Sequence, residues 1–316
     1  MNNDKHKLYM LRILKDVFND PDLSQILAFK GGTSLMFFYQ LPRFSVDLDF
    51  NILDITQKEM AYQKLREIAL KYGKIADEQL KHNDPLVVLD YEKGEQNLQL
   101  ELSTRFFDNH YELKNLAGTN IPVMVEPDIF AHKLCALLDR DGMTGHDVFD
   151  IHFFLSKQAP IHAGTVEQRM KKPFTNYLDD CIIALQTVSK KELMQNVGEF
   201  IEGKLKQEMK SGKLIDRTIE MLEERKIVPF ITEYPRNRMP IEDVTITHSP
   251  EGKNILLAQI AGKSFMDKEI STKESAIFQA LPKDEDRKNF LVHLARENYF
   301  DEWQKQSDRN TPSLKR

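Results

Sequence analysis

A strictly alternating segment at residues 46–52, VDLDFNI, places the strongest constraint on how this chain folds. A period of two is that of a β-strand, which would bury Leu48 and Phe50 and place Asp47 and Asp49 together on the opposite face. Two carboxylates so close repel each other unless a cation lies between them, and hard oxygen ligands suit Mg²⁺. By itself, the pair is as typical of the solvent face of an edge strand as of a metal site.

A glycine-rich turn upstream favours the metal-site interpretation. Residues 26–29, ILAF, have the character of a short strand, and Gly31, Gly32, Thr33 and Ser34 then precede an apolar helical segment. Glycines that open a helix leave backbone N–H groups unhindered for a phosphate at the positive helix end. This order of turn, helix and paired carboxylates is expected of an enzyme that transfers phosphoryl or nucleotidyl groups.

A third carboxylate lies on a later alternating segment. Residues 98–104 read LQLELST, with the leucines on one face and Glu101 on the other. Glu101 would complete a set of three oxygen ligands for two Mg²⁺ ions.

The rest of the pattern predicts an α+β chain with a mixed sheet, in which early strands give way to helices after Pro127. Single helices are expected at 8–18, 57–71, 129–139, 147–156 and 284–305. Several more are expected within 174–225. Further strands are expected at 86–90, 244–247 and 254–260, and the prolines of 229–240 indicate a connector.

Composition excludes some functions and leaves others open. The chain has 44 Lys and Arg against 49 Asp and Glu, a net charge of −5, so bulk positive charge does not hold it to nucleic acid. A local basic groove remains compatible with an RNA ligand. Two cysteines without CxxC spacing, and histidines without HxxxH spacing, give no sequence signal for zinc. No apolar run approaches the length of a membrane span, so we expect a cytoplasmic protein with no membrane partner.

Four segments resemble the AbiEii/AbiGii nucleotidyltransferase toxin family, a bacterial branch of the polymerase-β-type superfamily. Residues 29–35, FKGGTSL, and 43–50, RFSVDLDF, match its KGGT-x-L and R-x-S-x-D-x-D motifs. Residues 130–137, FAHKLCAL, are similar to its lysine motif. Residues 146–151, HDVFDI, are similar to its R-D-x-x-D helix start, with histidine in place of arginine.

The resemblance, which covers residues 25–230, implies a polymerase-β-type fold in three parts. These are a nucleotidyltransferase core at 1–125, a helical region at 126–232 that closes the active-site cleft, and a linker with a small C-terminal extension at 233–316.

The resemblance also implies the reaction and its residues. A nucleoside monophosphate would pass from an NTP to a cellular acceptor, with pyrophosphate released. Asp47, Asp49 and Glu101 would bind two Mg²⁺ ions and form the catalytic set with Lys133. The residues implied for nucleotide binding are Lys30, Gly31, Gly32, Thr33, Ser34, Arg43, Ser45, Asp147 and Asp150.

For the cell, the resemblance implies a toxin paired with a neighbouring antitoxin and linked to abortive phage infection. The 3′ end of tRNA is the acceptor implied by some members. The residues themselves leave the NTP and the acceptor open.

Two other functions are compatible with the sequence. Arg140 and His146 have the R-x5-H spacing that resembles metal-independent HEPN ribonucleases, although Gly142 and Gly145 predict a loop rather than a helix there. A non-catalytic nucleotide-binding module is the second alternative. The presence of all three carboxylates argues against such a degenerate site.

Overall fold

The computed structural model describes residues 2–80, 84–139, 142–189 and 203–310. The chain divides into two compact units. Unit 1 comprises residues 1–53, 57–103 and 109–232, and unit 2 comprises 54–56, 104–108 and 233–316. The residues assigned from sequence to the core and to the helical region therefore share unit 1, except for 54–56 and 104–108, which belong to unit 2.

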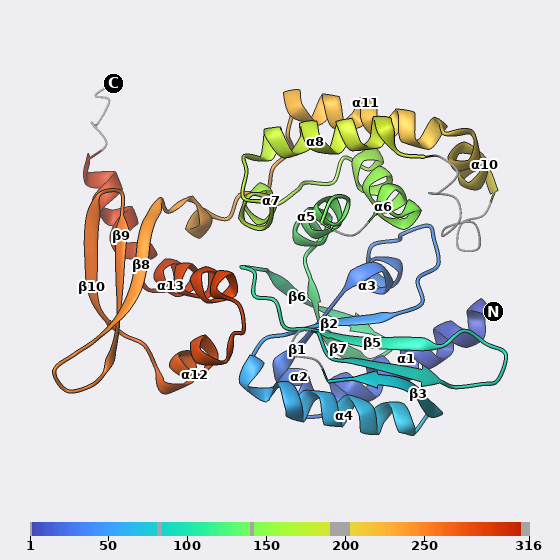
Figure 1. Cartoon of the computed structure of the whole chain (residues 1–316), viewed down its shortest axis with the longest axis horizontal. Coiled ribbons are helices and arrows are strands. Elements are labelled where there is room, and N and C mark those ends of the chain that lie inside the picture. The colour runs from blue at the N-terminus through green and yellow to red at the C-terminus, as the bar shows by residue number, and fades with distance from the viewer. Residues whose placement is uncertain (1, 81–83, 140–141, 190–202, 311–316) are drawn as a thin grey trace. The chain divides into compact units, whose positions relative to one another are not determined.

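A seven-stranded mixed sheet forms one layer of unit 1, in the order β3-β4-β5-β2-β1-β7-β6 (Figure 1). β2 runs parallel to β5 and β1 parallel to β7, and the other neighbours are antiparallel. The α+β class expected from the sequence is confirmed. The strands are β1 (Leu27–Lys30), β2 (Leu48–Ile52), β3 (Lys74–Gln79), β4 (Leu86–Asp90), β5 (Leu98–Ser103), β6 (Tyr111–Leu116) and β7 (Thr119–Met124).

One face of this sheet is covered by α1 (Asn3–Asn19), α2 (Leu23–Ile26) and α4 (Lys58–Leu70) (Figure 1). Residues of α1 and α4 at helical spacing pack with strand residues such as Phe29 and Phe50 in one buried cluster. The burial of this apolar surface fixes which face of β2 points away from the core.

The other face carries α3 (Gly31–Phe38) and, beyond it, a helical layer that has its own core (Figure 1). Phe130 and Phe154 stack there with ring centroids 4.6 Å apart, and the Tyr177 hydroxyl donates to the Leu134 carbonyl. Among the described residues, the helices of this layer are α5 (Glu126–Ala136), α6 (Gly145–Ser156), α7 (Ala163–Met170), α8 (Phe174–Thr187), α10 (Gly203–Ser211) and α11 (Lys213–Ile227).

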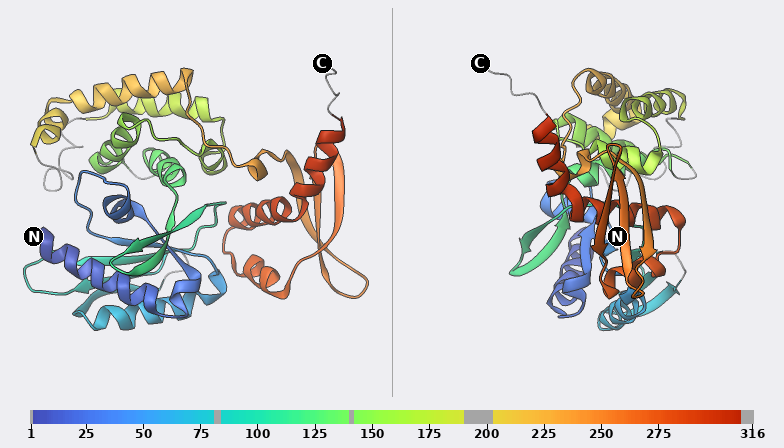
Figure 2. Two further views of the ribbon diagram at one scale, coloured as in Figure 1. Left: turned by 180° about the vertical axis from the view of Figure 1, so that it is seen from behind. Right: turned by 90° about the vertical axis from the view of Figure 1, so that its left-hand side faces the viewer.

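Unit 2 is a three-stranded antiparallel sheet with helices (Figure 2). Its strands are β8 (Ile241–His248), β9 (Asn254–Ile260) and β10 (Lys263–Glu269), and its helices are α12 (Thr272–Ala280) and α13 (Asp284–Asn310). Ile55 and Phe106 join its buried or partly buried apolar cluster from the short pieces 54–56 and 104–108. Among the described residues, no helix combines the length and apolar character needed to cross a membrane.

The sequence does not predict two of the hairpins, because their turns lack the residues typical of two-residue hairpin turns. β6 and β7 are joined by Ala117 and Gly118, and β9 and β10 by Ala261 and Gly262. All four residues have positive φ, 50° and 89° in the first turn and 50° and 70° in the second, as type I′ turns require. Asn-Gly and Asp-Gly are the strong signals for this turn, and alanine gives none.

Candidate functional site

Strand register brings a lysine and two carboxylates into one row. Lys30 on β1 is the cross-strand partner of Asp49 on β2, and Asp49 is the partner of Glu101 on β5. Leu48 and Phe50 are fully buried, as the alternation predicts. Asp47 lies one residue before β2, so the strand itself begins at Leu48 rather than at Val46.

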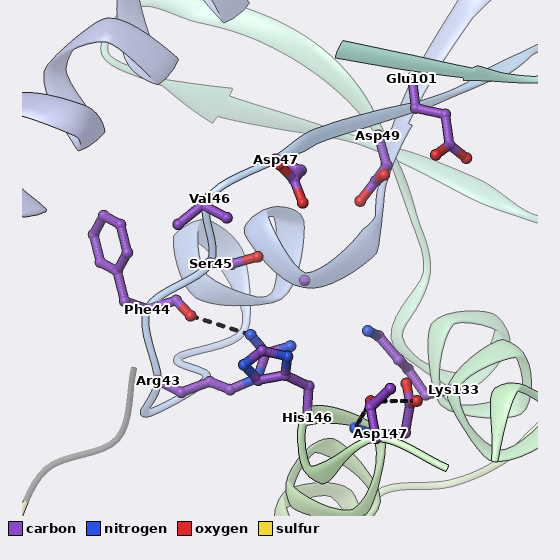
Figure 3. A pocket seen from close by; sticks show the side chains of 12 residues that line it. Arg43, Phe44, Ser45, Val46, Asp47, Asp49, Glu101, Lys133, His146 and Asp147 are labelled. Atoms are coloured by element: carbon purple, nitrogen blue, oxygen red, sulfur yellow. Dashed lines mark hydrogen bonds between the residues drawn. The ribbon is translucent and has the colours of Figure 1, made fainter. Parts of the chain in front are cut away.

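These carboxylates face a pocket in unit 1 together with residues of the helical layer (Figure 3). Asp47, Asp49 and Glu101 reach it from the sheet, and Lys133 points toward it from α5 on the opposite side. Segments more than 80 residues apart in the sequence therefore meet at one site. The full lining is Gly32, Arg43, Phe44, Ser45, Val46, Asp47, Asp49, Glu101, Lys133, Thr144, His146 and Asp147.

The electrostatics of the three carboxylates fit a bound cation. Burial, together with the negative charges of Asp49 and Glu101, raises the pKa of Asp47 from 3.8 to about 7, although a hydrogen bond from the Gln99 backbone N–H acts in the opposite direction. A divalent cation would stabilise the ionised form of Asp47 against this burial and the neighbouring negative charge. Because the donors are all oxygens, the set suits Mg²⁺, and Asp47, Asp49 and Glu101 are the residues able to hold it.

The two glycines allow the start of α3 to approach the carboxylates closely. Gly31 has a φ of +81°, and a Cβ atom there would lie 2.0 Å from Asp49 Oδ2. A Cβ atom on Gly32 would lie 2.6 Å from Ser45 Oγ. The glycines begin α3 rather than forming a separate turn before it, and any larger residue would displace the carboxylate or the 43–47 loop.

Several residues assigned from sequence to nucleotide binding support the pocket from outside its lining. The buried Thr33 hydroxyl donates to the Asp47 carbonyl, and the buried Ser34 hydroxyl donates to the Gly31 carbonyl at 2.8 Å. Lys30 lies in the row with Asp49, and burial lowers its pKa although Asp49 and Glu101 act in the opposite direction. Within the described part of the chain, Lys30, Gly31, Thr33, Ser34 and Asp150 are not lining residues.

Asp150 forms ion pairs with two positively charged side chains that line the pocket, Arg43 and Lys133. Arg43 donates to it through two parallel bonds, Nε to Oδ1 at 2.6 Å and Nη2 to Oδ2 at 2.7 Å, and Lys133 Nζ lies 2.8 Å from Oδ2. Burial raises the pKa of Asp150, but Arg43 and Lys133 outweigh it and lower the value to about 2. Asp150 therefore stays ionised and fixes the directions of Arg43 and Lys133.

The first turn of α6 is arranged around Thr144 and Asp147. The Thr144 hydroxyl donates to Asp147 Oδ2 at 2.6 Å and accepts from the Asp147 backbone N–H at 3.3 Å, so Asp147 belongs to the helix cap while also lining the pocket. His146 stands where the family motif has arginine. Burial, together with a smaller contribution from Arg43, lowers its pKa to about 4, so His146 is neutral at pH 7.

Four lining residues were not assigned to the site from sequence: Phe44, Val46, Thr144 and His146. Phe44 and Val46 fall in the variable positions of the R-x-S-x-D motif, and Thr144 precedes the matched helix start, so no residue-type signal marks them. Arg140, the partner of His146 in the ribonuclease hypothesis, lies outside the described residues.

The chain belongs to the nucleotidyl transferase AbiEii toxin family, assigned to type IV toxin–antitoxin systems, whose family model matches residues 12–222. No curated protein matches it. One solved structure, of a candidate nucleotidyltransferase from H. pylori, is 21% identical, with 70% of this chain and 96% of that chain covered and a TM-score of 0.42. A second, of JHP933 from Helicobacter pylori, is 22% identical over 72% and 96% of the two chains, again with a TM-score of 0.42.

Proposed function

We propose that this chain transfers a nucleoside monophosphate from an NTP to a hydroxyl group of a cellular RNA and releases pyrophosphate. The observation that carries the proposal is the convergence of Asp47, Asp49 and Glu101 on one pocket that also contains Lys133. Membership of a nucleotidyl transferase family supports the class of reaction.

The carboxylates would hold Mg²⁺ in this reaction. When bound, Mg²⁺ would activate the acceptor hydroxyl and neutralise charge on the reacting phosphates. Asp47, Asp49 and Glu101 would position it, since Asp49 and Glu101 face the pocket from the adjacent strands β2 and β5 and Asp47 faces it from the residue before β2.

The remaining polar groups would orient the triphosphate. Lys133 uses one contact on Asp150, and an ammonium group has three donors, so it can also bind a phosphate oxygen. The backbone of Gly32 and the hydroxyl of Ser45 would supply neutral donors from the opposite wall. A neutral His146 can donate one hydrogen bond but adds no positive charge, so phosphate binding would depend on Lys133 and Arg43.

The cellular role is the finer part of the proposal. We expect a cytoplasmic toxin that acts in abortive phage infection, is counteracted by an antitoxin encoded beside it, and modifies tRNA at the 3′ end. Family membership supports the toxin assignment, and the tRNA acceptor is the class of RNA to test first.

Labelling of RNA tests the reaction. Purified protein, each labelled NTP in turn, Mg²⁺ and total RNA should give a labelled RNA band, and purified tRNA should give the same product. Asp49→Asn should abolish labelling because it removes a central carboxylate of the set, whereas Asp77→Asn, which changes an exposed carboxylate of the same sheet, should label as the wild type does.

Labelling that survives Asp49→Asn, or that is unchanged in EDTA, would contradict the assignment. RNA cleavage in EDTA that disappears in His146→Ala would instead support the ribonuclease alternative. Calorimetry that shows NTP binding without turnover on any RNA would support the non-catalytic one.

A further inference from the structure

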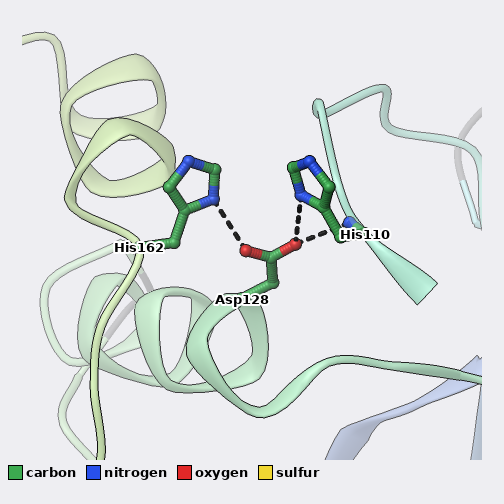
Figure 4. A group of neighbouring side chains, drawn as sticks. All are labelled: His110, Asp128 and His162. Atoms are coloured by element: carbon green, nitrogen blue, oxygen red, sulfur yellow. Dashed lines mark hydrogen bonds and ion pairs between the residues drawn. The ribbon is translucent and has the colours of Figure 1, made fainter. Parts of the chain in front are cut away.

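A second group of metal-ligating side chains lies apart from the carboxylate pocket. His110 precedes β6, Asp128 is in the first turn of α5, and His162 is the N-cap of α7 (Figure 4). One nitrogen of each histidine and one oxygen of Asp128 lie within 4.8 Å of one another. None of these three residues lines the pocket described above.

The geometry of this triad is compact and largely sealed from solvent. His162 Nδ1 lies 2.7 Å from Asp128 Oδ1, and His110 Nδ1 lies 3.1 Å from Asp128 Oδ2. Asp128 is fully buried and His162 is 2% exposed, whereas His110 is only partly buried. Figure 4 shows the two imidazole rings turned toward the same carboxylate from opposite sides. An ion could therefore enter past His110 and reach buried ligands.

We propose that His110, Asp128 and His162 form a binding site for a divalent transition-metal cation of the zinc type. Two imidazole nitrogens and one carboxylate oxygen are a donor set that zinc accepts, and four-coordinate zinc would take water as the remaining ligand. Mg²⁺ prefers oxygen ligands, so this site and the carboxylate pocket differ in the metal they select.

Bond lengths are compatible with the proposal. Zinc bonds of about 2.0–2.1 Å separate neighbouring tetrahedral ligands by about 3.3 Å. The two histidine–aspartate separations, 2.7 and 3.1 Å to different oxygens of Asp128, are shorter than this, and the three ligand atoms all lie within 4.8 Å of one another. Rotation of the side chains would bring them to a shared ion. Zinc would replace the protons that the histidine nitrogens share with Asp128, so binding releases protons and competes with these hydrogen bonds.

The surroundings already orient the ligands. The His110 backbone N–H donates to Asp128 Oδ2 at 2.6 Å and holds this carboxylate in place. Thr165 Oγ1 lies 2.8 Å from His162 Nδ1, the nitrogen that faces Asp128, so zinc would displace this contact as well. A Cβ atom on Gly164 would lie 3.1 Å from His162 Nε2, so glycine leaves room for this ring. A partner such as the His110 backbone N–H fixes the orientation of a metal ligand.

The consequence for the fold is a cross-link between distant segments. β6, α5 and α7 would be tied together at the N-terminal end of α5, and α5 also carries Lys133. The metal would have a structural role, unlike the cation proposed for the pocket. Local spacing motifs do not reveal this site, because His110 and His162 are 18 and 34 residues away from Asp128 in the sequence.

Metal binding by the full-length, EDTA-stripped protein tests this site. Asp47→Asn/Asp49→Asn is used as the background, so that the pocket carboxylates contribute little. Calorimetry with Zn²⁺ should give one equivalent bound, and Co²⁺ should give visible absorption typical of nitrogen ligands. Adding His162→Gln or Asp128→Asn should weaken Zn²⁺ binding at least about tenfold and remove the Co²⁺ bands.

His248→Gln is the matched control, because His248 is exposed on β8 and should leave binding unchanged. His110→Gln provides a milder change if the buried substitutions disturb folding, which circular dichroism will show. Zinc affinity that is the same with and without the triad substitutions would overturn the proposal. The absence of any zinc binding in the background variant would also overturn it, and would leave a purely hydrogen-bonded triad.

Discussion

Charged side chains in the pocket take their properties from their neighbours more than from their residue type. Burial raises the pKa of both Asp47 and Asp150. Asp49 and Glu101 then add to the effect at Asp47, which reaches about 7, whereas Arg43 and Lys133 reverse it at Asp150, which falls to about 2. A bound metal cation would therefore stabilise ionised Asp47, whereas Asp150 is already stabilised by the positive side chains of Arg43 and Lys133.

Removing the charge of Asp150 should destabilise the protein strongly. Asp150→Asn leaves Arg43 buried without an anionic partner, and breaking a buried pair in this way costs about 3–5 kcal/mol in the free energy of unfolding. Urea denaturation measures it. Asp179→Asn breaks an exposed pair with Lys226 and should cost much less, so equal effects of the two changes would contradict the argument.

His146 should make the protein less stable as the pH falls below 6.5. Its pKa is about 4 in the folded chain against an ordinary value of 6.5, so the unfolded chain takes up the proton first and stability is lost between these values. From pH 6.5 to pH 5, the wild type should lose up to about 2 kcal/mol relative to His146→Gln. Denaturation at both pH values measures this difference. His248→Gln, which changes an exposed histidine, should lose as much stability between these pH values as the wild type does. Equal losses in the wild type and in His146→Gln would refute the prediction.

At the scale of elements, the loop before β2 is the critical connection. It has no helix or strand from residue 40 to 47, yet it carries Arg43, Ser45 and Asp47 into the pocket. Two buried side chains fix it. Asp150 of α6 binds Arg43, and His6 of α1 bonds to the Val46 carbonyl at 2.8 Å through Nε2 and to the Tyr91 hydroxyl at 2.7 Å through Nδ1.

His6 should therefore act as a positioning residue for this loop. His6→Phe keeps a ring of similar size but leaves the Val46 carbonyl and the Tyr91 hydroxyl without this partner, which costs about 1–3 kcal/mol. Hydrogen exchange measured by mass spectrometry should become faster across residues 41–48. His152→Phe removes another buried histidine, which contacts Thr218, and should leave exchange in 41–48 unchanged. Exchange that is unaffected by His6→Phe would contradict the role.

At the scale of the whole molecule, the pocket requires both layers of unit 1. The sheet supplies the carboxylates, and the helical layer supplies Lys133 and the first turn of α6. Residues 109–232 lie in the same compact unit as the sheet, whereas the boundary near residue 232 separates unit 2. The net charge of −5 includes this carboxylate cluster, so bulk charge says little about whether RNA binds beside a metal-loaded site.

Much of the fold was predictable where the pattern had a single strong period. The alternation at 46–52 predicted a strand with Leu48 and Phe50 buried, and both are. The hairpins at Ala117-Gly118 and Ala261-Gly262 were not predicted, because alanine rarely has positive φ and gives no turn signal. The His110, Asp128 and His162 triad was also missed, since only packing brings these three segments together.

The sequence by itself determined the class of fold and the carboxylates on one face of a strand, because strand periodicity is a local property of the backbone. Family motifs added the candidate residues for the nucleotide. Tertiary structure decided which of them face the pocket. It placed Thr33, Ser34 and Asp150 behind the lining as supports, and it brought Phe44, Thr144 and His146 into the wall. The physical reason is that hydrogen bonds and ion pairs between distant segments depend on how the sheet and the helices pack, which no local pattern encodes.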